Sequence, residues 1–463
     1  MSLVDRAREL LRRALESRIF RDSSVLLVGN WVSTGLSIVG SIVLARLLEP
    51  TGYGQVILAT TIVSTIIQFL DIRTAEGLIH FVGQALARGE PREAVSYFYV
   101  GLSVDVLLML ATLVLAVFVA PLAAGAYPDG ELLRELVSIY VLTIPFVTLE
   151  GTFQAVLNIF KRFTLLAAGS LLFSLMQLVI LVLAARSGVV AVMWGYVIAS
   201  ALSLVMWIAF GLPLLVRNIR AMGGSLRPQG YRSALRSFLP FAFYTSVTAS
   251  IKAVTANVDM LVLGALRPVA DVGYFRIARS AASLITMPTS QVSVVIYPEL
   301  NEAWARGQLA RARDLIKRYT LVTLVASSAA LLFYVFAAEW LVRLFYGQDY
   351  FEAAPLIARL IVLLGVGIVL ESVFRWVRPA TMAQGKPQLT TFYSTAQIVL
   401  RLVLLVPLVY LFGAIGAALT YDLAVIWTVL LILFYVMPRL GLRVSLRPRA
   451  EVPGSIDPEP PEG

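Results

Sequence analysis

The residues best suited to chemistry in this 463-residue sequence are ionisable side chains that stand inside long apolar runs. Such a side chain is costly to insert into lipid, so we expect it to face protein or water. Basic members could bind an anionic group, and acidic members could carry a proton or a cation. The candidates for substrate binding in a central cavity are Lys252, Arg276, Arg279, Asp259, Arg46 and Arg375, and those for ion coupling are Asp105, Glu150 and Glu371.

Lys252 is the strongest substrate-binding candidate. It lies fourteen residues beyond Phe238, in the middle of an apolar run, where its ammonium group cannot easily reach the membrane interface. Lys252 and Asp259 are seven residues apart on one helix face, and Arg276 and Arg279 are three apart near the outer end of their run. Basic groups that line a water-filled cavity suit an anionic substrate, such as a pyrophosphate-linked lipid.

Several of these charges also have a structural explanation. Arg375 lies near the end of a run, where a long side chain can extend to the headgroups. Glu371 could form an ion pair with Arg375. Arg401 and Asp422 could pair across adjacent runs, which we favour slightly over a role in substrate binding.

Metal and thiol chemistry have no support in the sequence. There is no cysteine, and His80 is the only histidine, which is more typical of a surface residue than of a ligand. A lone histidine cannot build a metal cluster. We therefore expect no metal site, no cofactor and no catalytic residue.

The elements that must position these side chains are membrane-spanning helices. The sequence is 59% apolar and only 14% charged, whereas a soluble domain is about 25% charged. A span needs about 20 mostly apolar residues. The sequence therefore predicts an all-α polytopic membrane protein of twelve helices, at 24–47, 52–70, 94–119, 133–157, 164–185, 189–216, 238–265, 272–297, 319–341, 353–374, 388–411 and 413–437.

The distribution of lysine and arginine predicts the orientation. With the N-terminus inside, the inner segments hold 28 basic residues and the outer loops hold 5. Because cytoplasmic loops carry the excess of positive charge, both termini are expected in the cytoplasm and the protein in the cell membrane. The net charge of +10 then faces anionic lipid headgroups rather than nucleic acid.

Matching positions in the two halves indicate an internal duplication. Pro50 and Pro268 are 218 residues apart, and Gly188 and Gly413 are 225 apart. Six spans per half give both halves the same orientation, related by an axis along the membrane normal, with a cavity between them. The predicted parts are a cytoplasmic amphipathic N-terminus (1–22), an N-terminal six-helix bundle (23–217), a basic linker (218–237), a C-terminal six-helix bundle (238–438) and a largely disordered cytoplasmic tail (439–463).

Short motifs in a consistent order connect the chain to a known family. These motifs are 45–54 (ARLLEPTGYG), Asp71, 259–264 (DMLVLG), 272–278, 297–299 (YPE) and 385–386 (GK). Through them, from about residue 20 to 440, the sequence resembles the polysaccharide-transport flippases of the multidrug, oligosaccharidyl-lipid and polysaccharide exporter superfamily. Arg73 departs from the pattern, which has a small residue at that place.

The resemblance implies a fold and a function. Two six-helix bundles would form a V around a cationic central cavity. The protein would move oligosaccharide linked to a polyprenyl pyrophosphate from the inner to the outer leaflet, by alternating access, for cell-surface polysaccharide synthesis. Its partners would be this substrate, membrane lipids and a coupling H⁺ or Na⁺, and it would act as a monomer without nucleic acid.

Two other functions are alternatives for this sequence. The first is an ion-coupled drug or metabolite antiporter of the same superfamily, with Asp105, Glu150 or Asp259 as the ion site; the many basic residues argue mildly against cationic drugs. The second is a polytopic glycan polymerase or ligase. Such an enzyme needs an acid–base set, and the predicted outer loops are short and lack histidine. We therefore expect a transporter rather than an enzyme.

Overall fold

The computed structural model describes residues 18–70, 74–128, 130–287 and 289–441. Within these ranges it describes all side chains except those of 18–28, 243–256, 290–295, 298, 305 and 387. Lys252 falls in this second group, and Asp71 and Arg73 fall outside the described backbone. The predicted N-terminal stretch and tail also lie mostly outside the described residues.

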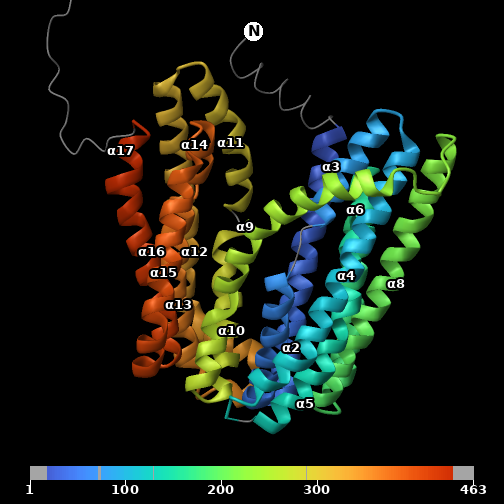
Figure 1. Cartoon of the computed structure of the whole chain (residues 1–463). Coiled ribbons are helices and arrows are strands. Elements are labelled where there is room, and N and C mark those ends of the chain that lie inside the picture. The colour runs from blue at the N-terminus through green and yellow to red at the C-terminus, as the bar shows by residue number, and fades with distance from the viewer. Residues whose placement is uncertain (1–17, 71–73, 129, 288, 442–463) are drawn as a thin grey trace, which may run out of the picture. The chain divides into compact units, whose positions relative to one another are not determined.

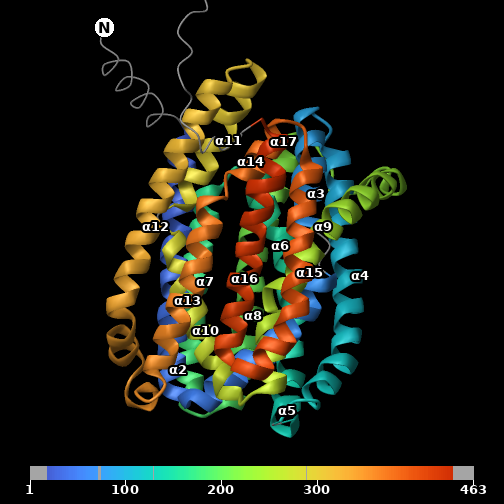
Figure 2. The same ribbon diagram turned by 90° about the vertical axis from the view of Figure 1, so that its left-hand side faces the viewer.

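Every element of the described chain is helical (Figures 1 and 2). The first part of the chain contains α2 (Arg18–Leu70), α3 (Thr74–Ala87), α4 (Pro91–Ala124), α5 (Gly130–Tyr140), η1 (Val141–Thr143), α6 (Ile144–Ile159), α7 (Phe163–Ala185), α8 (Val189–Ala221), α9 (Tyr231–Leu266) and α10 (Val269–Ser283). The remainder contains η2 (Leu284–Thr286), α11 (Ser290–Ala305), α12 (Leu309–Tyr346), η3 (Gln348–Tyr350), α13 (Ala354–Val373), α14 (Val377–Ala383), α15 (Pro387–Phe412), α16 (Ala414–Leu431), η4 (Ile432–Val436) and α17 (Met437–Arg439).

The helices confirm a polytopic membrane protein. Helix occupies each of the twelve predicted runs, with one interruption after η2. Over the described residues, nine helices are long and apolar enough to cross a membrane, and the first of them, Gly29–Leu70, contains two of the predicted runs. Large apolar side chains such as Phe118, Leu122 and Phe336 are exposed, as expected where lipid is the solvent.

The predicted boundary between the first two spans is a break inside α2. Glu49 has a φ of 58° and a ψ of 172°, which ends one helical run and starts another. Pro50 explains the break, because proline lacks an N–H group and disfavours helical geometry in the residue before it. Gly54 then approaches the chain that leads into α10, and a Cβ atom there would overlap the carbonyl oxygen of Val269.

The described chain forms two compact units. Unit 1 contains the residues up to Ala281, together with Tyr334–Val362 and Leu405–Ala418. Unit 2 contains Ala282–Phe333, Leu363–Leu404 and the residues from Leu419 onward. Unit 1 therefore combines α2 to α9 and most of α10 with parts of α12, α13, α15 and α16. The two six-helix halves inferred from the sequence remain a prediction.

The core of unit 1 depends on close approach between helices. Trp207 of α8 and Phe238 of α9 are almost fully buried. A side chain at Gly169 of α7 would meet the Trp207 ring, and one at Gly77 of α3 would meet the Phe238 ring. These two glycines make room for large rings, so the packing fixes how α3, α7, α8 and α9 fit together.

The first turns of α9 lie across the direction of α4 and α8, and the rest of the helix runs along them (Figures 1 and 2). Pro240 stands inside the helix, where it removes a backbone hydrogen bond and permits a bend. The preceding linker is attached to α4: buried Ser96 donates to the Gln229 carbonyl at 2.8 Å and accepts from its N–H at 2.7 Å. His80 is exposed and stacks on Phe241, so its ring is a surface contact, as expected.

Unit 2 has its own core. Leu300, Tyr319 and Trp376 are buried in one cluster that joins α11, α12 and the turn before α14. The Tyr319 hydroxyl donates to the Ser372 carbonyl of α13 at 3.4 Å. A π-helical turn, η4, follows α16 before the described chain ends at Gly441. These contacts define the frame in which the polar residues of α13, α15 and α16 are held.

Candidate substrate-binding and coupling sites

A polar cavity of about 220 Å³ lies inside unit 1, between α2, α7 and α8. Its described lining contains no acidic side chain, so Arg276, which reaches it from α10, supplies its formal charge. The other polar side chains come from the three surrounding helices: Ser37, Ser41, Tyr53, Ser174, Gln177 and Tyr196.

The break in α2 builds one wall of this cavity. Tyr53 follows the break and is fully buried. Its hydroxyl lies 2.6 Å from the hydroxyl of Ser41, twelve residues earlier in the same helix. A straight helix would carry these residues about 18 Å apart along its axis. The Glu49–Pro50 break therefore brings Tyr53 to the cavity.

Three polar side chains of the lining have no hydrogen bond within the described part of the chain: the amide of Gln177, the hydroxyl of Tyr196 and the guanidinium of Arg276. By contrast, the hydroxyls of Ser37 and Ser174 donate to backbone carbonyls of their own helices, each at 2.9 Å. Polar groups in an apolar surrounding are normally hydrogen-bonded. The amide and the guanidinium therefore retain donors for water or a ligand.

The second arginine of α10 has an acidic partner. The Arg279 guanidinium lies 3.9 Å from a carboxylate oxygen of Asp259, which is buried in α9, and Arg279 itself is about one-third exposed. Three of the predicted substrate-binding residues, Asp259, Arg276 and Arg279, thus lie on neighbouring parts of α9 and α10. Among them, Arg276 borders the polar cavity and Arg279 balances a buried charge.

Arg46 lies at the end of unit 1 that contains the α2 break. It is exposed, and its guanidinium donates to the Leu344 carbonyl at 2.6 Å. The Tyr350 hydroxyl donates to the neighbouring Ala45 carbonyl at 3.2 Å. Arg267 similarly donates to the Tyr410 carbonyl at 2.6 Å. These bonds connect α2 to the end of α12 and to η3, and the turn after α9 to the end of α15.

Asp105 is buried in α4 and accepts hydrogen bonds from the hydroxyls of Thr74 and Thr152. It borders a second cavity of unit 1, of about 300 Å³, which Thr112 and Thr148 also line. The Thr148 hydroxyl is buried and has no hydrogen-bond partner among the described residues. A carboxylate surrounded by hydroxyls could carry a proton or a cation, as the sequence predicted for Asp105.

The other two predicted coupling residues differ in environment. Glu150 is half-buried in α6, next to the fully buried hydroxyl of Ser203 in α8. Glu371 belongs to unit 2, is exposed, and accepts a hydrogen bond of 2.6 Å from the Tyr421 hydroxyl. Arg375 also belongs to unit 2 and is half-buried. The side chain of Lys252 is not among those described.

Arg401 and Asp422, which the sequence suggested as an ion pair, both lie in unit 2. The Arg401 guanidinium lies 5.6 Å from the centre of the Tyr421 ring. Asp422 is buried and accepts the backbone N–H of Gly367 at 3.1 Å. Tyr421 thus contacts both Arg401 and Glu371. The Asp422 carboxylate accepts its hydrogen bond from a backbone N–H group.

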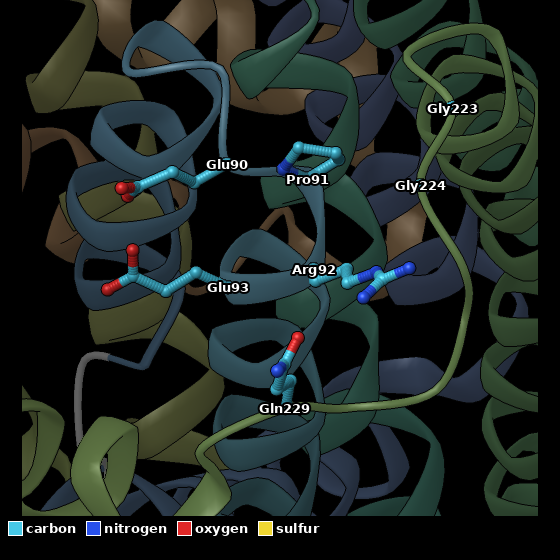
Figure 3. A pocket seen from close by; sticks show the side chains of 7 residues that line it. All are labelled: Glu90, Pro91, Arg92, Glu93, Gly223, Gly224 and Gln229. Carbon is cyan, nitrogen blue, oxygen red and sulfur yellow. The ribbon is translucent and has the colours of Figure 1, made fainter.

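A third hollow, of about 500 Å³, lies at the surface where α4 begins and the linker to α9 passes (Figure 3). Its acids already have a partner: Arg88 contacts Glu90 and Glu93, each at 2.9 Å. Hydrogen bonds with Glu93 and Arg88 lower the pKa of the Glu90 carboxyl. Figure 3 shows Glu90 and Glu93 directed away from Arg92. Its lining is Glu90, Pro91, Arg92, Glu93, Gly223, Gly224 and Gln229.

Metal ligands do not gather in the portion of the chain that the structure describes: no group of three or more histidine, aspartate or glutamate side chains there could hold an ion. The sequence contains no cysteine. The polar sites of the described chain are therefore built from hydroxyls, amides, guanidiniums and single carboxylates.

Sequence reasoning found the charged residues of these sites and missed the uncharged ones. Ser41, Tyr53, Gln177 and Tyr196 were not predicted as site residues, because their types are tolerated anywhere in a membrane helix. A usable signal was present in Ser174 and Gln177, which stand three residues apart on one face of a mostly apolar helix.

Solved structures with this fold are membrane transporters. An inward-facing multidrug resistance transporter of the MATE family in the MOP superfamily has a TM-score of 0.70 at 13% identity, over 88% of this chain and 94% of its own. The lipid II flippase MurJ, in an inward closed conformation, has a TM-score of 0.70 at 15% identity, over 89% of this chain and 87% of its own. An outward-facing MATE transporter has a TM-score of 0.63 at 14% identity, over 91% and 95%. The fold is that of the MOP superfamily.

The sequence identifies the branch. Residues 43–355 match the model of the polysaccharide biosynthesis protein family. The chain belongs to that family, which confirms the resemblance to the polysaccharide-transport flippases of the MOP superfamily. A search of curated proteins found no match to the sequence. The protein is thus a multi-pass membrane transporter of the MOP type.

Proposed function

We propose that this protein moves a polyprenyl-pyrophosphate-linked oligosaccharide from the inner to the outer leaflet of the cell membrane for surface polysaccharide synthesis. The headgroup binds to cationic side chains inside the membrane while the lipid tail stays in the bilayer. Transport proceeds by alternating access around a cationic central cavity between two six-helix halves. No covalent chemistry is involved, so the protein is not an enzyme.

The observation that carries this proposal is Arg276. Its guanidinium borders a polar cavity within a bundle of apolar helices and has no ion pair or hydrogen bond among the described residues. An arginine in such a place is costly unless it serves binding or a polar pathway. Its planar donors suit phosphate and carboxylate groups. Arg279, Arg46, Arg375, Lys252 and Asp259 are proposed as the rest of the substrate-binding set.

The proposal includes a coupling ion and an arrangement in the membrane. Asp105, with two hydroxyl donors, is the best-supported place for H⁺ or Na⁺, and Glu150 and Glu371 are further candidates. Both termini lie in the cytoplasm, as the distribution of basic residues predicts. The protein acts as a monomer.

Transport of a fluorescent lipid-linked oligosaccharide by proteoliposomes tests this function. Wild-type protein is expected to expose the glycan to an external hydrolase faster than protein-free vesicles do. Arg276→Ala, the pair Arg276→Ala/Arg279→Ala, and Lys252→Ala are each expected to abolish this transport while the purified protein stays monodisperse. The single Arg276→Ala change leaves the Asp259–Arg279 pair intact, so it separates binding from folding.

The matched control is Arg217→Ala/Arg220→Ala, in which two exposed arginines, also three residues apart, are removed from the end of α8. This control should transport normally. Wild-type transport by all of the cavity variants would contradict the proposed site. Equal rates for wild-type vesicles and protein-free vesicles would contradict the function.

A drug or metabolite antiporter is the second candidate, and the Asp105 cavity favours it. A carboxylate bordering a cavity of about 300 Å³ suits a coupling site for an exporter of small molecules. Ion-driven uptake of cationic dyes into the same vesicles separates the two functions. Dye transport that requires Asp105 but not Arg276 would support the antiporter.

A further inference from the structure

We infer that the polar cavity of unit 1 holds one acidic sugar ring of the transported glycan, such as a uronic acid. This inference rests on the proposed function and adds to it a chemical class of substrate. It follows from three properties of the cavity: its size, its charge and its unused hydrogen-bonding groups.

Size limits the ligand to a single ring. The volume of about 220 Å³ is below the range of about 300–1,000 Å³ that is usual for drug-sized ligands. It corresponds to roughly seven water molecules at about 30 Å³ each. An oligosaccharide cannot enter as a whole, but one of its residues can occupy this space.

Charge favours an anionic substituent on that ring. Arg276 is the only charged residue among the described lining residues. The nearest buried carboxylate on α9, Asp259, is paired with Arg279. A guanidinium without an acidic partner binds a carboxylate through two parallel N–H donors, and such charge-assisted bonds are stronger than neutral ones.

Hydrogen-bonding capacity accounts for the rest of the ring. The Gln177 amide offers two donors and one acceptor, none of them used within the described chain. The Ser41 and Tyr53 hydroxyls contact each other at 2.6 Å and together keep one donor for a ligand. Tyr196 adds an aromatic face, fixed by edge-on packing against Tyr140 with the ring centres 5.5 Å apart. Amide, hydroxyl, guanidinium and ring match the hydroxyls, carboxylate and apolar face of a uronic acid.

Binding of small probes to the purified full-length protein tests the inference directly. The probes are methyl glucuronide, methyl glucoside and inorganic phosphate, and the readout is protection against thermal unfolding over a concentration series. Wild-type protein is expected to bind methyl glucuronide at least tenfold more tightly than methyl glucoside. Arg276→Gln should remove this preference, and Gln177→Leu should weaken both sugars several-fold. Phosphate should not compete with the sugars.

Arg186→Gln and Gln154→Leu are the matched controls. Arg186 is an exposed arginine at the end of α7, and Gln154 is a half-buried glutamine of α6, away from the cavity lining. Both variants should keep the wild-type preference. Equal binding of the two sugars by wild-type protein would overturn the inference. Phosphate binding that depends on Arg276, without sugar binding, would also overturn it, because the cavity would then take the pyrophosphate.

The probe measurements and the vesicle assay fail separately. If vesicles transport the lipid-linked oligosaccharide but Gln177→Leu and Arg276→Gln bind the sugars as wild type does, the sugar site is wrong and the function stands. If the probes bind as expected but no lipid-linked glycan moves, the cavity is an acidic-sugar site and the proposed transport is wrong.

Discussion

Two hollows of unit 1 that contain arginine, the surface hollow beside α4 and the polar cavity at Arg276, differ in more than their volume. The surface hollow beside α4 is the larger, at about 500 Å³, yet its carboxylates are already bonded to Arg88 and it opens where the chain meets solvent. The cavity at Arg276 is less than half as large, and its guanidinium and its Gln177 amide have no described partner. Unsatisfied donors in an apolar setting are a better guide to a binding site than volume, because only they gain hydrogen bonds when a ligand arrives.

Reversing one charge in each hollow should give the largest contrast. Arg276→Glu replaces a favourable bond to an anion by repulsion, and a hydrogen bond to a charged group alone contributes about 1.5–3 kcal/mol, or about 10- to 150-fold in affinity. Transport of lipid-linked oligosaccharide in vesicles should therefore be lost. Arg92→Glu in the surface hollow should leave transport within twofold of wild type. Equal effects at the two positions would remove the distinction between the hollows.

Neutralising Asp105 tests whether the cavity of about 300 Å³ that it borders takes part in transport, as proposed for the Arg276 cavity, or not, as expected for the surface hollow. Asp105→Asn keeps the shape of the side chain and removes the charge; its amide oxygen can still accept from one threonine hydroxyl, and its NH2 group can donate to the other. We expect transport driven by an imposed ion gradient to fall about tenfold or more, with methyl glucuronide binding unchanged. Gradient-driven transport at the wild-type rate would exclude Asp105 from coupling. Glu131→Gln, at an exposed carboxylate of α5, is the control.

A matched pair of glutamines gives an intermediate effect. Gln177→Leu removes neutral hydrogen bonds, which contribute about 0.5–1.5 kcal/mol each, so the concentration of glycan that half-saturates transport should rise about 2- to 10-fold. Gln229→Leu, in the lining of the surface hollow, should leave it unchanged, because Ser96 contacts only the backbone of Gln229. Unchanged saturation in Gln177→Leu would show that the amide does not bind the glycan.

The smallest expected effect is on the stability of the fold, through the carboxyl of Glu90 at the surface hollow. Since hydrogen bonds with Glu93 and Arg88 lower the pKa of Glu90 in the folded protein, this carboxyl stabilises the fold above its ordinary pKa and loses that contribution as the pH falls. Arg88→Ala should slightly lower the thermal unfolding temperature near neutral pH, and the difference from wild type should vanish in acid. A difference that persists in acid would point to packing rather than charge.

The sequence predicted the helices well because a span is a local property. The Glu49–Pro50 break was expected from Pro50 alone, since proline restricts the residue before it. Arg276 and Arg279 were selected because charge is conspicuous in an apolar run. The partners of these residues could not be predicted. Helix packing decides which face of α7 meets α2, and therefore that Gln177 and Ser41 line the same cavity. Hydropathy does not distinguish a serine that faces a cavity from one that bonds to its own helix.

The two hydrogen bonds between Ser96 and Gln229 have a consequence for how the gene could be divided into two reading frames. In the linker, Gly223 is exposed and Gly224 is half-buried. The helices on both sides of the linker, including α9 and most of α10, belong to unit 1. A peptide bond cut between these glycines would leave the next segment held by both hydrogen bonds of Ser96 and by the Phe238 ring against Gly77. Fragments 1–223 and 224–463, co-expressed from separate reading frames, should therefore copurify. A cut after Ala281 would also divide unit 1, because Tyr334–Val362 and Leu405–Ala418 belong to it.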